Sequence, residues 1–360
     1  MTNTNTKHLR FEDFKVKFNE ASVEYLFRQY EKTGFLYPEK KALLAPHIQS
    51  ITKNWKTLLN GKEDMLWILT SINKNNNNFS SVSVWKQSNA GMQAQHLVSD
   101  GNPFLSLKVM LATQYKAEHH FTKHELNSSQ NWFRPNNRYA YRVFASMYDK
   151  LGPNKASLRL FQYLNMPLQK IEKSDAMDFE IIPVTGVNLE FINFVRQQYG
   201  EVFVQAEELN QSDILLEKMN IQYQQYDLQR YRKVVQIRCK QTRKIIAAAI
   251  VNRAPLGINF SFLENKAYYI LAEDLSITER IKVLKVINGI VNEYYTDFPL
   301  KAIPIVTDKG TSEALQSIGA NYLRAYMQSI WMRSGFALWF NHIYSFLQKI
   351  ESRQLRRKVS

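Results

Sequence analysis

The order of the predicted helices and strands occurs twice in this chain, and this repeat restricts the fold more than any other feature. In the first half, helical apolar spacing over 20–31 and 44–58 is followed by three strand-like runs, "MLWILTSI", "SSVSVWK" and "GMQAQHLV". Apolar residues three or four positions apart predict a helix, and short apolar runs between turn-forming residues predict strands. A helix, a short strand, a second helix and a last strand complete this half.

The second half repeats that order after residues 167–178, where the pattern breaks. A strand over 179–184 and helices over 188–199 and 207–218 come first, followed by the strand-like runs "KVVQIRC", "KIIAAAIVN", "GINFSFL" and "AYYIL". A helix near 276–295, a strand, a helix and a final strand follow. The recurrence of one element order at this length predicts two copies of one unit.

We therefore expect an α/β (α+β) protein of two units in tandem, residues 1–168 and residues 178–335. Each unit is predicted to be a mixed, largely antiparallel sheet flanked by helices. The first unit is expected to be the ligand-binding or catalytic half.

Residues 336–360 are predicted to form a C-terminal amphipathic helix with a basic end. Its apolar stripe includes Phe336, Trp339, Ile343 and Leu347, and "RQLRRK" follows the stripe. Such a helix can dock on its own domain, bind a partner protein or lie on an anionic membrane surface. We expect docking on the protein's own domain, and the partner protein and peripheral membrane contact stand as alternatives.

The composition is typical of a globular protein in a reducing compartment. Apolar residues make up 45% of the chain and aromatic residues 13%, well above the content of disordered chains. No apolar stretch reaches about eighteen residues, and the first residues lack an apolar signal segment. The single cysteine, Cys239, excludes an internal disulfide. We expect a soluble, cytoplasmic protein in which this cysteine is a structural thiol.

Positive charge is concentrated in the first half of this basic protein. The formal net charge is +15, and residues 1–170 contain 23 Lys and Arg against 12 Asp and Glu. A field of this sign attracts a small anionic ligand, a phosphorylated cofactor, RNA or an acidic lipid surface. Charge alone does not choose among these partners.

The end of each unit carries short motifs that resemble the GNAT superfamily of acyltransferases. The first unit has "NWFRPNNRYAYRVFASMYDKLGP" and the second has "IPIVTDKGTSEALQSIGANY". The element order over residues 20–335 is also similar to that of tandem GNAT proteins. The resemblance implies a sheet that opens between its fourth and fifth strands to admit acyl-CoA as a co-substrate.

The resemblance also implies a role for Tyr148, which stands four residues before Gly152. Family members place there a tyrosine that protonates the departing CoA thiolate. The alternative is that the Tyr148 ring packs under the final strand. The second unit has Leu315 at the equivalent position, and because a leucine cannot donate a proton, this unit is expected to be degenerate.

His96 is the candidate base of the first unit. It lies in the run "GMQAQHLV", which the resemblance equates with the fourth strand of the family. An imidazole there could take a proton from an amine substrate, directly or through water. A hydrogen-bonded structural histidine is the alternative. His120 and His124 are four residues apart, but no third zinc ligand accompanies them, so we expect no metal site.

The phosphate-binding loop of the family is reduced in both units. Family members carry glycines between the fourth strand and the next helix, so that backbone N–H groups can approach the CoA phosphates. The first unit offers Ser99, Gly101 and Asn102 as a shortened anion site, and a capped turn without a ligand is the alternative. The second unit has no glycine there, and its Glu273 and Asp274 would repel a phosphate.

Arginines alternate with aromatic residues in "WFRPNNRYAYR", which begins within the short strand predicted between the last two helices of the first half. Trp132, Arg134, Asn137 and Arg138 are candidates for the rim of a substrate or anion site, because arginine forks bind phosphates and carboxylates. A strand-to-helix junction with its arginines in water is the alternative.

These features together predict an acyl-CoA-dependent N-acyltransferase that acts on an amine. We expect an anionic ligand in the cleft bounded by residues 96–104 and 132–148, with its binding weakened by Arg134→Ala or Arg138→Ala, and we expect the cleft of the second unit to be blocked. One alternative is a non-catalytic GNAT-like binding or regulatory module for a nucleotide or a protein partner. The other is a Fem-like transferase that uses aminoacyl-tRNA. Whether the protein is an enzyme stays open at this stage.

Overall fold

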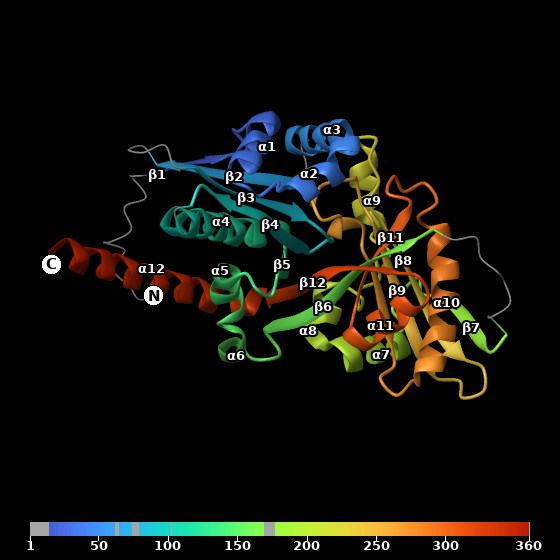
Figure 1. The fold of residues 1–360 in the computed structure, drawn as a ribbon. Helices are drawn as coiled ribbons and strands as arrows, with labels where there is room; N and C mark the ends of the chain where they lie inside the picture. Colours follow the sequence, from blue (N-terminus) through green and yellow to red (C-terminus); the bar gives the residue numbers. More distant parts are fainter. Residues whose placement is uncertain (1–13, 62–64, 74–78, 102, 169–176, 360) are drawn as a thin grey trace.

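A computed structural model of the chain describes residues 14–61, 65–73, 79–101, 103–168 and 177–359. Within these residues the strands form one twelve-stranded mixed sheet with helices on both faces (Figure 1). The elements of the first half are β1 (Phe14–Phe18), α1 (Val23–Lys32), α2 (Pro38–Leu44), η2 (Ala45–His47), α3 (Ile48–Asn60), β2 (Leu66–Asn73), β3 (Phe79–Lys86), β4 (Gly91–Ser99), α4 (Pro103–His124), β5 (Ser128–Phe133), α5 (Arg138–Ala140), the π-helical turn η3 (Tyr141–Ala145), α6 (Tyr148–Leu151) and β6 (Ala156–Pro167).

The second half repeats this order and ends in a long helix. Its elements are β7 (Phe179–Pro183), α7 (Leu189–Tyr199), α8 (Glu201–Ala206), α9 (Glu217–Gln224), β8 (Tyr231–Cys239), β9 (Ile245–Arg253), the 3₁₀ turn η5 (Leu263–Asn265), β10 (Ala267–Leu271), α10 (Ile277–Glu293), β11 (Ala302–Thr307), α11 (Lys309–Ser317), β12 (Asn321–Met332) and α12 (Arg333–Val359). The predicted mixed α/β fold of two similar units with a C-terminal helix is confirmed.

The two halves exchange their last strands. The sheet order is β1-β2-β3-β4-β5-β12-β6-β11-β10-β9-β8-β7. β6 ends the first half but pairs with β11, whereas β12 ends the second half but pairs with β5. At the centre β6 and β12 pair with each other in antiparallel orientation. The unit boundaries 1–168 and 178–335 stay a prediction, because both neighbours of β6 belong to the second half and both neighbours of β12 belong to the first.

The strands of the first half bury both of their faces. On β2, Leu66 and Ile68 pack in the cluster formed with α1 and α3, whereas Trp67 packs with Phe336 of α12 and Leu69 packs with Val109 of α4. Helices α1, α2 and α3 therefore cover one face, and α4 and α12 lie on the other (Figure 1). Alternation of side chains along a strand produces this division.

The connection between β9 and β10 reaches from the second half into the core of the first. Ile258, Phe260 and Phe262 are buried in the same cluster as α1 and α3. The Trp55 indole donates to the carbonyl of Gly257 over 2.8 Å. The sequence expectation of a strand over 257–263 is therefore wrong, because the alternating apolar residues serve the core of the other half and not the face of a strand.

A second expectation also fails in this half. The helix predicted over 207–218 is absent, and turns occupy 207–215 before α9 begins at Glu217. The two acids at the start of this stretch, Glu207 and Glu208, are buried and bonded to other parts of the chain.

Glu207 and Glu208 connect the halves through buried hydrogen bonds. Glu207 pairs with Arg232 over 3.0 Å and accepts hydrogen bonds from Gln130 of β5 and from the Tyr268 hydroxyl, each over 3.0 Å. Glu208 accepts from the Ser88 hydroxyl over 2.7 Å and from backbone N–H groups of the β3–β4 turn. A buried charge is tolerated only when it is paired and hydrogen-bonded in this way.

Helix α12 docks on the first half, as predicted for the C-terminal segment. Trp339 stacks on Trp331 of β12, and its indole donates to the carbonyl of Val143 over 2.8 Å. Ile343 and Leu347 are buried in the same cluster. The apolar stripe of the first turns of α12 is thus covered by the protein itself.

We expect Gly257→Ala to lower the free energy of unfolding by at least about 2 kcal/mol. Gly257 has a φ of 78°, which costs a residue with a Cβ about 1 kcal/mol or more, and a Cβ there would overlap the Ile51 side chain. Urea unfolding measures the effect. Gly186→Ala is the matched control, since a Cβ at Gly186 meets nothing within 4 Å. Equal stability of the two variants would contradict the packing of the β9–β10 connection on α3.

Candidate functional site

The parallel strands β4 and β5 separate in the middle of the first half. They pair only from Gly91 beside Ser128 to Ala94 beside Asn131, although β4 continues to Ser99 and β5 to Phe133. The side of β4 that faces β5 therefore has no strand partner beyond Ala94 among the described residues. Unpaired strand edges offer N–H and C=O groups to a ligand.

A β-bulge on β4 lies at the point of separation. Ser83 pairs with Gln95 but Ser81 pairs with Val98, so β4 has one extra residue opposite Val82. His96 takes a φ of 51° within this bulge. Bulges bend a strand and interrupt its pairing, which accounts for the divergence of β4 from β5.

A cavity of about 450 Å³ occupies the opening between β4 and β5. The segment between α1 and α2 and the start of α2 line it from one face of the sheet, through residues such as Phe35 and Tyr37. From the other face, Met110 of α4 and the α5–η3 segment line it. The β9–β10 connection and β12 of the second half complete the wall. The cavity is thus lined from both faces of the sheet and by both halves of the chain.

Three cations and a tyrosine meet on the α1–α2 face of the cavity. The Tyr37 hydroxyl accepts a hydrogen bond from Arg134, which follows β5, and another from Arg324 of β12, each over 2.7 Å. The Lys40 Nζ lies 4.2 Å from the centroid of the Phe35 ring. Among the described residues that line the cavity, none is acidic. This part of the cavity is therefore electropositive.

The pKa of Lys40 is unusually low for a lysine. Burial, together with the nearby Arg324 and Arg134 charges, lowers the pKa of Lys40 to about 7. Both causes disfavour the charged ammonium. An anion in the cavity would act in the opposite direction and restore the charge.

The side of the cavity next to α4 carries a group of apolar residues. Its apolar members are Val82, Leu97, Met110, Phe133, Ala140 and Phe144. Most of them belong to the cluster that α4, β5 and η3 form on the face opposite α1 and α2. A cavity with one apolar part and a few converging polar groups is the usual form of a ligand site.

Two residues that line the cavity each have a buried polar atom without a hydrogen-bond partner among the described residues. These atoms are the Trp132 Nε1 and the Tyr139 hydroxyl. Buried donors of this kind are rare unless a ligand or water satisfies them. Burial also raises the pKa of Tyr139 well above its ordinary value, so the phenol keeps its proton.

His96 lines the cavity, but both of its ring nitrogens are engaged. The Phe260 backbone N–H donates to Nε2 over 3.0 Å, and Nδ1 lies 3.1 Å from the Ser83 hydroxyl. Because a backbone N–H can only donate, Nε2 carries the lone pair and Nδ1 the proton. Burial and the Lys40 charge hold the pKa of His96 well below its ordinary value. This geometry favours a neutral positioning residue, stacked on Trp55, over the predicted base.

Tyr148 does not line the cavity. It is half-buried and packs against the cluster of α4, η3 and α12. Tyr37, Tyr139 and Tyr326 line the cavity, and of these Tyr139 lies near the start of the same helical region as Tyr148. The proton-donor role assigned to Tyr148 stays a prediction, and the placement of Tyr139 offers a second candidate.

The remaining predicted residues divide between the cavity and its surroundings. Trp132, Arg134 and Asn137 line it, and the Asn137 side chain also caps α5 by accepting from the Ala140 N–H over 3.0 Å. Ser99, Gly101 and Arg138 lie outside the lining. Asn102 lies outside the described residues.

Sequence reasoning missed Tyr37, Lys40 and Arg324, and it placed Tyr139 in the arginine-aromatic motif without a role as proton donor. Tyr37 and Arg324 are separated by 287 positions in the chain. One signal was present for Lys40, since "YPEKK" places two lysines at the start of a short helix. Arg324 lines the cavity only because of the strand exchange. Without the exchange, β12 would lie within the second half, away from the cavity.

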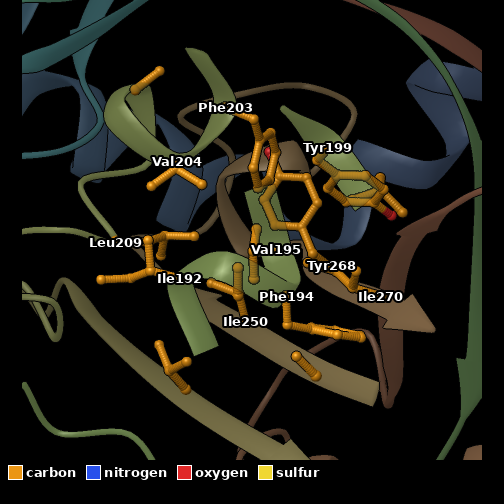
Figure 2. Close-up of a cluster of buried hydrophobic side chains, with 14 of the residues drawn as sticks. Ile192, Phe194, Val195, Tyr199, Phe203, Val204, Leu209, Ile250, Tyr268 and Ile270 are labelled. Atoms are coloured by element: carbon orange, nitrogen blue, oxygen red, sulfur yellow. The ribbon is translucent and has the colours of Figure 1, made fainter. Parts of the chain in front are cut away.

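Aromatic side chains occupy the corresponding region of the second half. β10 and β11 are parallel and pair only at Ala267 beside Ile305 and Tyr268 beside Val306. Figure 2 shows Tyr199, Phe203 and Tyr268 packed together in the buried cluster there. The Thr307 hydroxyl donates to the carbonyl of Tyr269 over 2.7 Å. Side chains of the protein thus fill the region beside β10 and β11, whereas the equivalent region beside β4 and β5 is a cavity that a ligand could occupy.

Three solved structures indicate what the chain is similar to. A tandem GNAT protein from the clavulanic acid biosynthesis pathway is 8% identical, covers 88% of this chain and 98% of its own, and has a TM-score of 0.38. A GCN5-related N-acetyltransferase from Sphaerobacter thermophilus is 11% identical, with 89% and 96% covered and a TM-score of 0.41. N-myristoyltransferase from Saccharomyces cerevisiae is 7% identical, with 89% and 80% covered and a TM-score of 0.36.

No protein-family model matches the chain, and no curated protein matches it either. The similarity to the three structures therefore concerns the course of the chain and carries no argument about activity.

The described residues contain no helix that is both long and apolar enough to cross a bilayer. They also contain no group of three His, Cys, Asp or Glu side chains placed to hold a metal ion. The side chains of His120 and His124 lie outside the described part.

Proposed function

We propose that this protein transfers an acyl group from a thioester, with acyl-CoA as the expected donor, to an amine within the cavity between β4 and β5. One observation carries the proposal: the cavity lies in the opening between two parallel strands and is lined from both faces of the sheet. Two substrates can therefore approach each other from opposite faces. Direct transfer between two bound substrates needs this arrangement, because the reacting atoms must come within about 3–3.5 Å.

The thioester fits the side of the cavity next to α4. The apolar residues of that side suit an acyl chain, and the unpaired edge of β4 beyond Ala94 suits an extended amide-containing arm such as that of CoA. A backbone N–H of this edge could also stabilise the oxyanion that forms at the thioester carbonyl.

The cavity supplies means for both proton transfers. An amine must be neutral to attack, and the positive charges of Lys40, Arg134 and Arg324 disfavour a protonated amine nearby. The proton therefore leaves for water without a dedicated base. As the thiolate departs, the unpartnered Tyr139 hydroxyl can donate a hydrogen bond to the sulfur.

Calorimetric titration with acetyl-CoA, octanoyl-CoA and palmitoyl-CoA tests the proposal. We expect at least one of them to bind with a Kd between about 1 μM and 1 mM, the usual range for substrates, and to release thiol when an amine is added. ADP serves as the control for simple nucleotide binding. Failure of all three thioesters to bind rejects acyl transfer, and binding of a thioester and ADP without thiol release favours the non-catalytic binding module.

A further inference from the structure

We infer that the acceptor amine carries a carboxylate or phosphate group, which Lys40, Arg134 and Arg324 bind on the α1–α2 face of the cavity. The role of acceptor rests on the proposed acyl transfer. The anion site itself rests on the geometry of the three cations.

The three cations converge although they come from distant parts of the chain. Arg134 and Arg324 donate to the same Tyr37 oxygen, so their guanidinium groups both lie within hydrogen-bond distance of one atom. Lys40 is close enough to both for their charges to lower its pKa. Like charges held together in a partly buried site repel each other unless an anion joins them.

The protein itself supplies no such anion. Among the described residues, no ion pair connects Lys40, Arg134 or Arg324 to a carboxylate, whereas Lys41 pairs with Glu31 next to it. The tyrosine oxygen is a neutral acceptor and satisfies one N–H of each arginine. The remaining N–H groups of the two forks match the geometry of carboxylate and phosphate oxygens.

The location of the cations assigns the anion to the acceptor and not to the thioester. Tyr37 and Lys40 belong to α2 and to the link before it, on the face opposite α4. The apolar part of the cavity lies on the α4 face. A thioester that enters from the α4 face places its carbonyl at the opening, so the cations remain for the molecule that enters from the other face.

The same cations explain why an anionic amine would react well. The carboxylate or phosphate neutralises the repulsion among the cations and positions the amine near the opening. The residual positive charge still disfavours the ammonium form of that amine. Binding and activation therefore use one set of residues.

Lys40 gives this site a dependence on pH. Its pKa of about 7 means that the site loses one positive charge as the pH rises from 6 to 8. The charged or titratable groups and rings around Lys40 are Arg134, Arg324, His96, Phe35 and Tyr37. The arginines keep their charge in this range, and His96 is neutral throughout.

Affinity for free phenylalanine, which keeps both its charges between pH 6 and 8, should therefore fall by up to about tenfold across that range. The substitution Lys40→Met should remove this dependence on pH.

Three matched pairs of amines probe the inference in the full-length protein. They are glycine and glycinamide, phenylalanine and phenylalaninamide, and phosphoethanolamine and ethanolamine. In each pair we call the member with the carboxylate or phosphate the anionic member. We expect at least one anionic member to bind at least about tenfold more tightly by calorimetry than its partner without that group, as one charge-assisted hydrogen bond implies. The first two pairs test a carboxylate and the third tests a phosphate.

Two substitutions test whether the arginines bind the carboxylate or phosphate, and a third substitution is the control. Arg324→Gln and Arg134→Gln should each reduce the affinity for the anionic member by about tenfold or more and leave the affinity for its partner without the carboxylate or phosphate unchanged. Arg134 is exposed at the mouth of the cavity, so its substitution keeps the fold. Arg138→Gln is the matched control, because Arg138 is also exposed but does not line the cavity.

The possible results separate this inference from the proposed function. Equal binding within all three pairs, or no binding of any anionic member up to about 10 mM, ten times the usual upper KM, overturns the anion site. A loss of acetyl-CoA affinity in Arg324→Gln without a loss for the anionic amine also overturns it, since the cations then bind the CoA phosphates. Preference for the anionic amines without any thioester binding supports the anion site and rejects acyl transfer alone.

Discussion

Glu207→Ala is expected to lower the free energy of unfolding by about 3–5 kcal/mol, the usual effect of removing one partner of a buried ion pair. The Glu207 carboxylate is buried and pairs with the equally buried Arg232. Burial alone would raise the pKa of Glu207, but Lys266 and Arg232 outweigh it and hold the pKa below its ordinary value. Without Glu207, the buried charges of Arg232 and Lys266 lose the carboxylate that stabilises them.

The position of Glu207 makes this substitution a test of how the halves are joined. Gln130 of β5 donates to Glu207, and Gln328 of β12 donates to Gln130 over 2.8 Å. Chemical denaturation followed by circular dichroism measures the effect. Glu201→Ala is the control, since the Glu201–Arg196 pair is partly exposed and is worth about 1 kcal/mol at most. If Glu207→Ala were no more harmful than Glu201→Ala, the junction of the halves would not depend on this ion pair.

Tyr139→Phe is expected to lower kcat about 100-fold, the lower end of the contribution of a positioned proton donor, and to leave thioester affinity unchanged. The Tyr139 hydroxyl is buried in the cavity wall with no partner among the described residues. Its raised pKa keeps the proton available as the thiolate leaves. Steady-state kinetics of thiol release, together with calorimetry of the thioester, separates turnover from binding.

Tyr148→Phe provides the comparison, because Tyr148 is the tyrosine that the family resemblance favours. We expect it to retain kcat within about threefold, since the Tyr148 ring packs against α12 and does not line the cavity. A large loss of turnover in Tyr148→Phe, with Tyr139→Phe unaffected, would assign the proton donor to Tyr148. Loss of stability in either variant is checked by its melting temperature.

The shared cavity has a consequence for the role of the second half. Asn259 and Ser261 of the β9–β10 connection and Arg324 and Tyr326 of β12 line the cavity beside residues of the first half. The second half thus contributes both wall and charge to a site that lies between strands of the first half. Its own corresponding region is packed with Tyr199, a residue at the end of α7.

Local patterns were sufficient to predict most of the elements of this fold. The run "KIIAAAIVN" became β9, and the helix expected near 276–295 became α10, which begins with a capping box between Ser276 and Glu279. The opening between β4 and β5 was expected from the family resemblance. Such features depend on neighbours within a few positions, or on an element order, and both can be read directly from a sequence.

The failures of sequence reasoning share a different origin. The alternation of Ile258, Phe260 and Phe262 is correct as a pattern of burial, but the surface that buries them is the core of the other half. Likewise the periodicity of 207–218 could not show that Glu207 would pair with Arg232. A periodic pattern records which residues are buried and leaves open what buries them.

The sequence by itself therefore determined two similar mixed α/β units, an electropositive first half and a C-terminal helix that docks through its apolar stripe. Only the tertiary structure decided that β6 and β12 exchange places, and this exchange brings Arg324 to within 2.7 Å of Tyr37. The physical reason lies in the backbone. An antiparallel strand forms the same N–H···O=C bonds with any neighbour of suitable register, so local chemistry does not specify its partner. The choice depends on the packing of side chains over the whole sheet, and the candidate site depends on that choice.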